Sequence, residues 1–301
     1  MLQRWMLLWL CLLSTVAFLW PTEPHLDPFL ITKPWLGQLI VVTMFALGWL
    51  LPDHEVRQVL RRWPLVGGGT LNQYDSMPLL AWGIANTFPL SDEFKIGIVM
   101  VGCVPGAMAS NVLTMMARGN ASYSLSLTTL ATCLSPLLVP IVLTITLRQQ
   151  LDQPLTKLVV DLTWMVLIPV VAGHLIGRSV GPRKRQVDGW FQNLAAFSIL
   201  WIIAVVVGAN RHRVEQLTPA LAAAVVVLNL AGYLAGRAGA GLLRLDVPMR
   251  RALILEIGMQ NAGLGTTLAS KLFEDQPGAM VPSAIYTFGC MLTGTGLAWY
   301  W

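Results

Sequence analysis

The stretch VGCVPGAMASNVLTMMARGN, residues 101–120, has the composition of a membrane-spanning segment that is interrupted at its middle. Pro105 and Gly106 break the apolar run, and the polar residues Ser110 and Asn111 follow. Proline removes a backbone donor and clashes with the preceding turn, so a helix must stop or kink there. An unpaired backbone group in hydrocarbon costs several kcal/mol, so such a break persists only inside protein or beside a water-filled cavity. We therefore predict a discontinuous helix at this place.

A second stretch, in the other half of the chain, has the same character. Residues 255–267 read LEIGMQNAGLGTT and add a carboxylate, Glu256. Asn111 and Asn261 hold corresponding positions in the two halves of this 301-residue chain. Two interrupted segments at matching places in two halves are the sequence pattern that indicates a transporter site.

The composition indicates that the chain is a membrane protein. The sequence is 55% hydrophobic and only 12% charged, and its apolar residues come in runs long enough to cross a membrane. We predict one polytopic membrane domain, residues 1–301, rather than soluble domains. The net charge of +5 does not indicate a nucleic-acid partner, because the basic residues lie between the apolar runs. The sequence contains no HExxH, GxSxG or P-loop motif, so we predict no enzyme, and no protein partner is evident.

We expect an all-α fold of ten transmembrane helices joined by short loops. The predicted spans are residues 4–20, 35–51, 65–88, 96–117, 122–146, 156–177, 190–209, 218–242, 251–272 and 281–299. The two sets of five spans start on opposite sides of the membrane. This predicts an inverted 5+5 repeat in which the discontinuous fourth and ninth helices cross at mid-membrane.

The distribution of basic residues predicts the orientation. Most of the 20 lysines and arginines fall on the side that a cytoplasmic N-terminus would occupy. Because cytoplasmic loops carry the excess of lysine and arginine, we predict a multi-pass protein of the cell inner (plasma) membrane with both termini in the cytoplasm.

Glu256 is the first candidate for chemistry. An acidic side chain within an apolar span is costly and usually faces the protein interior beside a partner. No lysine or arginine is predicted at a similar depth, so a bound cation is the natural complement. Gln260 lies one helical turn further on the same face, and oxygen ligands of low net charge suit Na⁺ or a proton. The alternative is a protonated structural glutamate that is hydrogen-bonded to a neighbouring helix.

Polar side chains near the first break can complete an ion site. Ser110 and Asn111 follow the break, and Ser124 and Thr128 lie one turn apart on the next predicted span. Together they offer four side-chain oxygens beside Glu256. The alternative for Ser124 and Thr128 is that small polar residues let helices pack closely and hydrogen-bond across the interface.

The third predicted span adds two polar residues. Gln73 is a further candidate oxygen ligand, and Asp75 is a second intramembrane acid. For Asp75 three interpretations stay open: contact with a second cation, a proton relay, or local hydrogen bonding. His174 and Cys103 are each interpreted first as packing residues, with a soft ligand as the alternative for Cys103.

Three longer motifs resemble a known family. VGCVPGAMASN, ARGNASYSLSLTTLATCLSPLLVP and LEIGMQNAGLG are similar to motifs of the bile acid:sodium symporter family, in particular of its bacterial members. The resemblance covers nearly the whole chain. It implies a panel of about residues 4–51 and 156–209, a core of about residues 65–146 and 218–299, and unwound fourth and ninth helices.

The same resemblance implies two sodium sites and a substrate cavity. The implied ligands of the first site are Ser110, Asn111, Ser124, Thr128 and Glu256, and those of the second are Gln73, Glu256, Gln260 and the backbone carbonyls of Ile257 and Met259. Asn261 would face the substrate cavity. Met108 stands in a sequence, Gly106-Ala107-Met108, where the family commonly has Gly-Gly-Thr. Cys290 and Met291 stand where its tenth helix often carries His-Asn, so we expect a more apolar cavity around Met108, Asn261 and Met291.

The expected function is sodium-coupled symport of a small organic anion, bile-acid-like or another carboxylate, by alternating access. The first alternative is a proton-coupled or arsenite-type exporter of the same superfamily that uses Cys103 and Glu256. The second is a membrane ligand sensor that does not transport.

Overall fold

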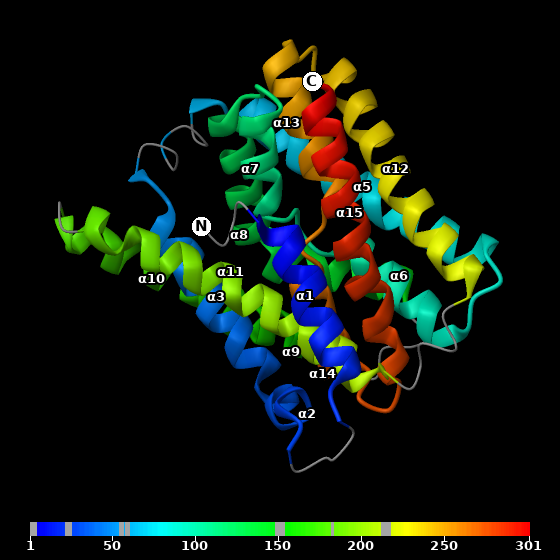
Figure 1. The fold of residues 1–301 in the computed structure, drawn as a ribbon. Coiled ribbons are helices and arrows are strands. Elements are labelled where there is room, and N and C mark those ends of the chain that lie inside the picture. The colour runs from blue at the N-terminus through cyan, green and yellow to red at the C-terminus, as the bar shows by residue number, and fades with distance from the viewer. Residues whose placement is uncertain are drawn as a thin grey trace.

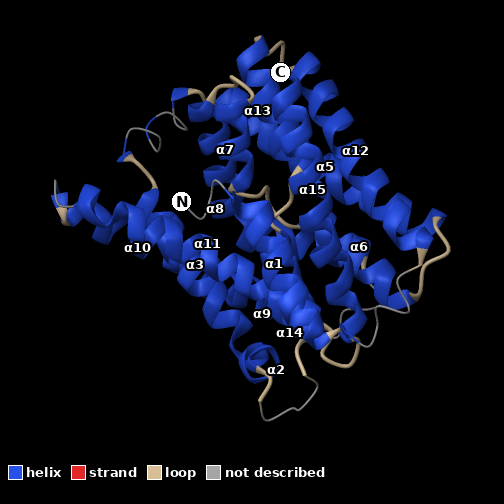
Figure 2. Cartoon of the chain, viewed as in Figure 1, coloured by secondary structure: helices blue, strands red, loops and turns tan. Residues whose placement is uncertain are grey.

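The computed structural model describes residues 5–21, 26–53, 57, 61–147, 154–181, 184–211 and 218–301, and all regular elements among them are helices (Figure 2). The elements in chain order are α1 (Met6–Leu19), α2 (Pro28–Thr32), η2 (Lys33–Trp35), α3 (Leu36–Leu50), α5 (Trp63–Thr87), α6 (Asp92–Cys103), α7 (Ala109–Met116), α8 (Ala121–Thr146), α9 (Leu155–Leu162), η3 (Thr163–Leu167), α10 (Ile168–Ser179), α11 (Lys184–Ala209), α12 (Pro219–Leu242), α13 (Val247–Gly258), α14 (Ala262–Leu272), η6 (Pro277–Met280) and α15 (Val281–Tyr300).

Five helical stretches of the described chain are long and apolar enough to cross a bilayer by themselves. They are Pro28–Leu50, Ala121–Thr146, Leu155–Ser179, Gln186–Ala209 and Pro219–Leu242, and α1 is a shorter apolar helix. The two interrupted segments fall short because each is divided into pieces of 8 to 12 residues. The all-α prediction is confirmed, whereas ten spans in an inverted repeat stay a prediction.

Several helices begin at a capping side chain, and in two of them proline follows the cap directly. The side chain of Asp27 accepts from the backbone of Phe29, that of Thr218 from Leu221, and those of Asp246 and Asn120 from residues in the first turns of α13 and α8. Pro28 and Pro219 occupy the first position of their helices, where the missing N–H costs nothing. The capping side chains and prolines explain why these helices begin at these residues.

The helices pack in two groups; in Figure 1, α3 and α10 of one group lie at the left, and α5, α6 and α12 of the other lie at the right. The side group contains α1, α3, α9, α10 and α11, in which α3 packs on both α10 and α11, and α1 on α11. The central group contains α5 to α8 and α12 to α15, in which α5 packs on α6, α8 and α12, and α12 packs on α13. The interrupted segments both belong to the central group.

Contacts at the two ends of the central group show that the interrupted segments are antiparallel. At the carboxy-terminal end, Arg251 at the start of α13 lies over the Trp301 ring and donates to the carbonyl of Ala117, just beyond α7. At the far end, the Glu93 carboxylate at the start of α6 accepts from the backbone N–H of Gly278, which follows α14. The α6–α7 and α13–α14 segments therefore run in opposite directions.

The two groups touch through elements near the far end and the middle of the bundle. α14 packs on α3 and α11, α15 packs on α1 and α11, and α8 packs on α9 and η3. An ion pair also crosses between the groups, with Lys271 Nζ of α14 3.4 Å from Asp161 Oδ2 of α9. Because both side chains are partly exposed, this pair contributes little to stability.

Glycines allow α3 and α10 to cross closely. A Cβ at Gly48 of α3 would overlap the carbonyl of Val170 in α10, with 2.7 Å to the carbonyl carbon. A Cβ at Gly173 of α10 would lie 2.8 Å from the backbone nitrogen of Trp49. Close backbone approach at small residues is a common basis of helix association in membranes.

Gly48→Ala should therefore lower stability by about 1–3 kcal/mol, because the new methyl group meets backbone that cannot rotate away. The measurement is the apparent melting temperature of the purified protein in detergent. Gly67→Ala in α5 is the matched control, because a Cβ there meets nothing within 4 Å. Equal melting temperatures for the two variants would contradict this account of the helix crossing.

Candidate functional site

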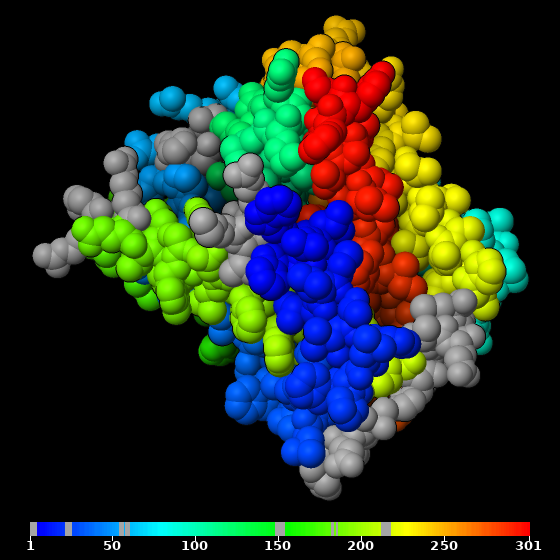
Figure 3. Space-filling view, viewed as in Figure 1, coloured from blue at the N-terminus to red at the C-terminus, as the bar shows by residue number. Residues whose placement is uncertain are grey.

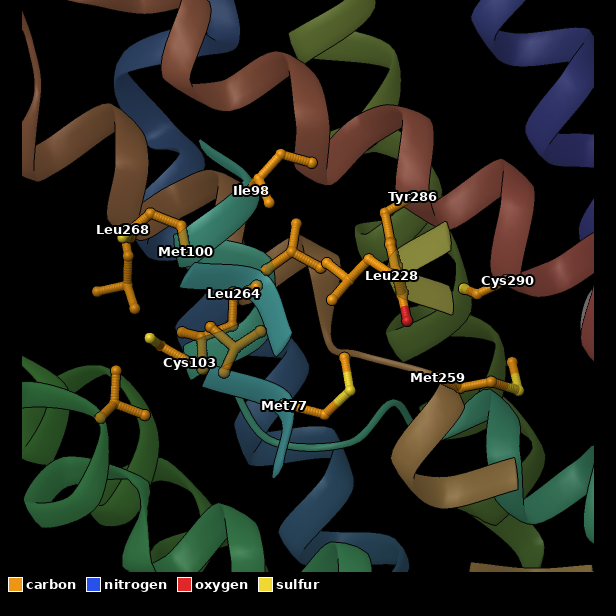
Figure 4. Close-up of a cluster of buried hydrophobic side chains, with 14 of the residues drawn as sticks. Met77, Ile98, Met100, Cys103, Leu228, Met259, Leu264, Leu268, Tyr286 and Cys290 are labelled. Carbon is orange, nitrogen blue, oxygen red and sulfur yellow. The ribbon is translucent and has the colours of Figure 1, made fainter. Parts of the chain in front are cut away.

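The two interrupted segments meet at their breaks. α6 ends at Cys103 and α7 begins at Ala109, while α13 ends at Gly258 and α14 begins at Ala262. The predicted interruptions are thus both present. Figure 4 shows Cys103 at the end of α6 and Met259 at the other break, among buried side chains such as Met77 and Leu264.

The backbone groups freed by each break pair with the other break. The N–H of Ala107 donates to the carbonyl of Met259 at 2.7 Å, and the N–H of Asn261 donates to the carbonyl of Pro105 at 2.8 Å. Gly106 and Gln260 form the antiparallel bridge between them. Backbone that is irregular inside a membrane protein needs such partners, so each break stabilises the other.

Gly106 brings this backbone against Glu256. A Cβ at position 106 would overlap Oε1 of Glu256 and lie 2.7 Å from its carboxyl carbon. Glycine is therefore required here for space. The carboxyl group of one broken helix consequently sits directly beside the unwound backbone of the other.

Hydroxyl groups surround the Glu256 carboxylate, whose residue is only 2% exposed. Ser110 Oγ donates to Oε2 at 2.5 Å. Thr128 Oγ1 lies 2.8 Å from Oε1 and 2.9 Å from Oε2. None of the ion pairs between described residues includes Glu256. The carboxylate is thus satisfied by hydrogen bonds but not by a positive side chain.

The same cluster extends to Asn111 and Ser124. Asn111 Oδ1 accepts from Ser124 Oγ at 2.8 Å and lies 3.3 Å from Thr128 Oγ1. Thr114 Oγ1, which the sequence interpretation did not include, donates to Ser124 Oγ at 3.3 Å. Thr114 lies one turn after Ser110, and that spacing was a usable signal. The structure thus brings together all five residues expected at the first site, and it adds Thr114.

Glutamine side chains form a second, adjoining cluster. Gln73 Nε2 of α5 donates to Gln260 Oε1 at 2.7 Å, and Gln260 Nε2 donates to the carbonyl of Ile257 at 2.8 Å. The backbone N–H of Met259 turns back to the carbonyl of Glu256 at 3.4 Å. Gln73 Oε1 is buried and accepts no hydrogen bond from the described residues. Buried polar atoms normally have partners, so this unpaired oxygen is available to a cation.

The donor set of both clusters consists of hydroxyl, amide, carbonyl and carboxylate oxygens. Within the described residues, no group of three or more His, Cys, Asp or Glu side chains gathers as the ligands of zinc and other transition metals usually do. Hard oxygen ligands of low net charge favour Na⁺ or a proton over a transition metal.

A polar network on α12 and α15 holds the second break. The carbonyl of Gly258, the last residue of α13, accepts from Asn229 Nδ2 at 2.7 Å and from the Tyr286 hydroxyl at 2.8 Å. Thr293 Oγ1 in turn donates to Asn229 Oδ1 at 2.7 Å. The sequence interpretation missed these residues, although an amide within the apolar run of α12 is a visible signal.

The three residues expected to line the substrate cavity are placed differently from one another. Asn261 is half-buried and its Oδ1 accepts from the N–H of Leu264 at 3.1 Å, so it caps α14. A Cβ on Gly263 would lie 3.6 Å from Asn261 Oδ1 and 3.9 Å from Ile40 of α3, which places this corner toward the side group. Met108 is half-buried, whereas Met291 is only 7% exposed.

Other candidates from the sequence lie away from the clusters. Asp75 is exposed on the face of α5 that carries Leu71 and Leu79, about 200° around the helix from Gln73. This placement does not favour contact of Asp75 with the ion clusters. Cys103 is buried with its sulfur 3.8 Å from Thr146 Oγ1, and His174 contacts Asp53 and the carbonyl of Leu51.

The family model of the sodium bile acid symporter family matches residues 38–217. The chain belongs to this family. The uncharacterized sodium-dependent transporter YocS of Bacillus subtilis is 32% identical over 298 residues, which covers 98% of this chain and 89% of the relative. The family resemblance drawn from the motifs is therefore confirmed.

More distant relatives share the same region. The probable sodium/metabolite cotransporter BASS1 of Arabidopsis thaliana is 27% identical over 271 residues, covering 90% of this chain and 67% of the relative. The sodium/bile acid cotransporter 4 of Mus musculus is 28% identical over 275 residues, covering 85% and 62%. This symporter-family protein is thus a membrane protein from a family of sodium-dependent transporters.

Because Asn229 and Tyr286 share the Gly258 carbonyl, we expect their contributions to stability to be coupled. Asn229→Leu or Tyr286→Phe alone leaves one donor on the carbonyl, at a cost of about 1 kcal/mol each. The double variant leaves the carbonyl unpaired, so its loss of stability should exceed the sum of the two single losses. Apparent melting temperatures in detergent measure this coupling.

Tyr123→Phe provides the matched control. The Tyr123 hydroxyl donates to the carbonyl of Leu65 at 2.9 Å, away from the second break, so its effect should add to that of Asn229→Leu without coupling. If Asn229→Leu and Tyr286→Phe are also merely additive, the shared carbonyl does not hold the break.

Proposed function

We propose that the protein is a secondary active symporter that couples Na⁺ to the uptake of a small organic anion by alternating access. The observation that carries the proposal is the buried Glu256 carboxylate at the crossing of two broken helices. It is surrounded by neutral oxygen-bearing side chains and has no positive partner among the described ion pairs. A carboxylate in that environment favours a small monovalent cation.

Two sodium positions account for the two oxygen clusters. In the first, the oxygens of Ser110, Asn111, Ser124, Thr128 and Glu256 replace the water shell of the ion. In the second, Gln73 Oε1, Gln260 Oε1, Glu256 and the carbonyls of Ile257 and Met259 do so. The unpaired Gln73 Oε1 supports the second position. The Na⁺ ions are cargo that is released after each cycle, and the names of the relatives support sodium as the coupling ion.

The moving parts in this proposal are the two helix groups. The side group corresponds to the panel, about residues 4–51 and 156–209, and the central group to the core, about residues 65–146 and 218–299. Ten spans in an inverted repeat would relate the halves. The antiparallel course of α6–α7 and α13–α14 supports that symmetry.

The arrangement of the groups suggests which side is open. If both termini are cytoplasmic, as the basic residues favour, then the far end of the bundle is the outer end. α14 and the Lys271–Asp161 pair join the groups toward that end. The proposed state is therefore closed to the outside, with the site approached from the cytoplasm of a cell inner (plasma) membrane.

The coupling follows from charge and shape. Na⁺ neutralises Glu256 and ties α7, α8 and α13 to one another, so the crossing is ordered before substrate binds. The organic anion would bind next to the crossing, near Met108, Asn261 and Met291, where the N-terminal ends of α7 and α14 carry partial positive charge. The ion shifts the equilibrium only to the extent that its affinity differs between the two states.

Glu256→Gln should weaken sodium binding at both proposed positions, because the Glu256 carboxylate contributes to each of them. The amide keeps the size of the side chain and can still accept from Ser110 and Thr128, so the fold should persist. We expect the apparent affinity for Na⁺ to fall by at least about tenfold, which corresponds to about 1.4 kcal/mol. The measurement is thermal stabilisation of the purified protein by NaCl against choline chloride, together with sodium-driven uptake of carboxylates and steroid acids into proteoliposomes.

Asp75→Asn is the matched control, because it also neutralises an intramembrane acid but on an exposed face. Its sodium dependence should equal that of the unmodified protein. Transport that follows a pH gradient and ignores sodium would reject the proposal in favour of a proton-coupled exporter. Glu256→Gln protein with unchanged sodium dependence would reject Glu256 as the sodium ligand. Ligand binding without flux would indicate a sensor.

Two coupled sodium positions predict a sigmoidal sodium titration. Gln73→Leu removes a ligand of the second position alone, so the titration should become hyperbolic while Glu256-dependent binding remains. Asn72→Leu is the control from the neighbouring position, since Asn72 donates to the carbonyl of Ala235 and not to the clusters. A titration of Gln73→Leu that stays sigmoidal would argue against the second site.

A further inference from the structure

A cavity of about 410 Å³ lies between α1, α11 and α15, apart from the ion clusters. Its size is within the usual range of small-molecule sites, roughly 300–1,000 Å³. In Figure 3, α1 (blue) and α15 (red) lie side by side on the face toward the viewer. The cavity therefore lies where the side group meets the central group.

The lining is apolar, and none of its residues carries a charge. Phe18 of α1 and Phe288 and Ile285 of α15 contribute the larger side chains. Phe18 is 40% exposed and its neighbour Leu19 is 72% exposed, so the rim of the cavity belongs to the apolar outer surface of the bundle. In a membrane protein that surface faces acyl chains, and a charged occupant would find no partner in the wall.

Two of the lining residues, Ser14 and Asn210, each carry a buried oxygen atom without a partner in the described part of the chain, which distinguishes the cavity from a plain packing gap. Ser14 Oγ of α1 and Asn210 Oδ1, just beyond α11, are buried without a hydrogen-bond partner among the described residues. Ser14 and Asn210 are 7% and 5% exposed. Asn210 Nδ2 already donates to the carbonyl of Val206, so the carbonyl oxygen is what remains. Buried polar atoms normally find partners, so these two favour an occupant that carries a neutral polar group.

We propose that this cavity binds an uncharged, single-chain amphiphile with a hydroxyl group, entering from the bilayer. The chain fills the apolar space between Phe18 and Phe288, and the hydroxyl group donates to Asn210 Oδ1 or exchanges a hydrogen bond with Ser14. Because the cavity is walled by both helix groups, a bound molecule holds them in this arrangement. That consequence for transport rests on the function proposed above, whereas the binding itself does not.

Photolabelling tests the site without any transport assay. The probe is a long-chain alcohol with a diazirine in its chain, added to the full-length protein in detergent and mapped by peptide mass spectrometry. We expect labels on α1 and α15, competed by dodecanol but not by dodecane or by charged dodecanoate. Labels spread evenly over the outer helices, or equal competition by the three compounds, would overturn the proposal.

Two serine variants test the proposed hydrogen bond to Ser14. Ser14→Ala removes one unpaired hydroxyl with little change of shape and should weaken dodecanol competition about two- to tenfold, as expected for one hydrogen bond. Ser283→Ala is its matched control, because Ser283 Oγ is also buried and unpartnered among the described residues but does not line the cavity. Equal effects of the two serine variants would contradict the proposed role of Ser14.

Ala284→Phe fills the cavity, and Ala222→Phe places the same bulk on the exposed face of α12. Labelling should be lost in the first variant and kept in the second. If transport is measured in parallel, dodecanol should slow uptake by the unmodified protein and not by Ala284→Phe. Labelling that fails while sodium-driven uptake persists would reject this site and leave the proposed function standing.

Discussion

Burial of the Glu256 carboxylate is the constraint on which the rest of the structure depends. A carboxylate inside an apolar bundle must be hydrogen-bonded, paired with a cation or protonated, because an isolated charge there is too costly. The chain supplies hydroxyl groups from α7 and α8 and leaves the oxygen atoms of neighbouring amides close by. The carboxylate therefore has hydrogen-bond donors but, among the described residues, no positively charged side chain beside it. This combination is expected of a site that binds a cation reversibly.

Backbone geometry follows from the same constraint. Gly106 has no Cβ, and a Cβ at this position would overlap the Glu256 carboxyl group. The first break can therefore contact that group. The two breaks then exchange hydrogen bonds through Ala107 and Asn261, and the Gly258 carbonyl is held by Asn229 and Tyr286. The unwound segments are thus held in place within the core by hydrogen bonds. Only those polar groups that lack a partner within the protein remain available to a ligand.

Much of this site was predictable because its signals are local. Pro105 and the glycines mark the breaks, and Glu256 is conspicuous in an apolar run. The rest depends on how helices rotate and pack. Asp75 looks equivalent to Glu256 in the sequence, yet packing of α5 turns it to the exposed face. Asn229 and Tyr286 act through a partner 28 or 29 residues away, which local patterns do not specify.

The central claim is that a sodium ion completes the oxygen cluster around Glu256, and a pair of high-resolution experimental structures tests it most directly. One is determined in sodium chloride and the other in choline chloride. The account predicts density for an ion between the Glu256 carboxylate and the Asn111 side chain in sodium alone, with the Ser110 and Thr128 hydroxyl oxygens turned toward that ion. Identical clusters in the two salts, with the hydroxyl groups still donating to the carboxylate and no ion density, would contradict it.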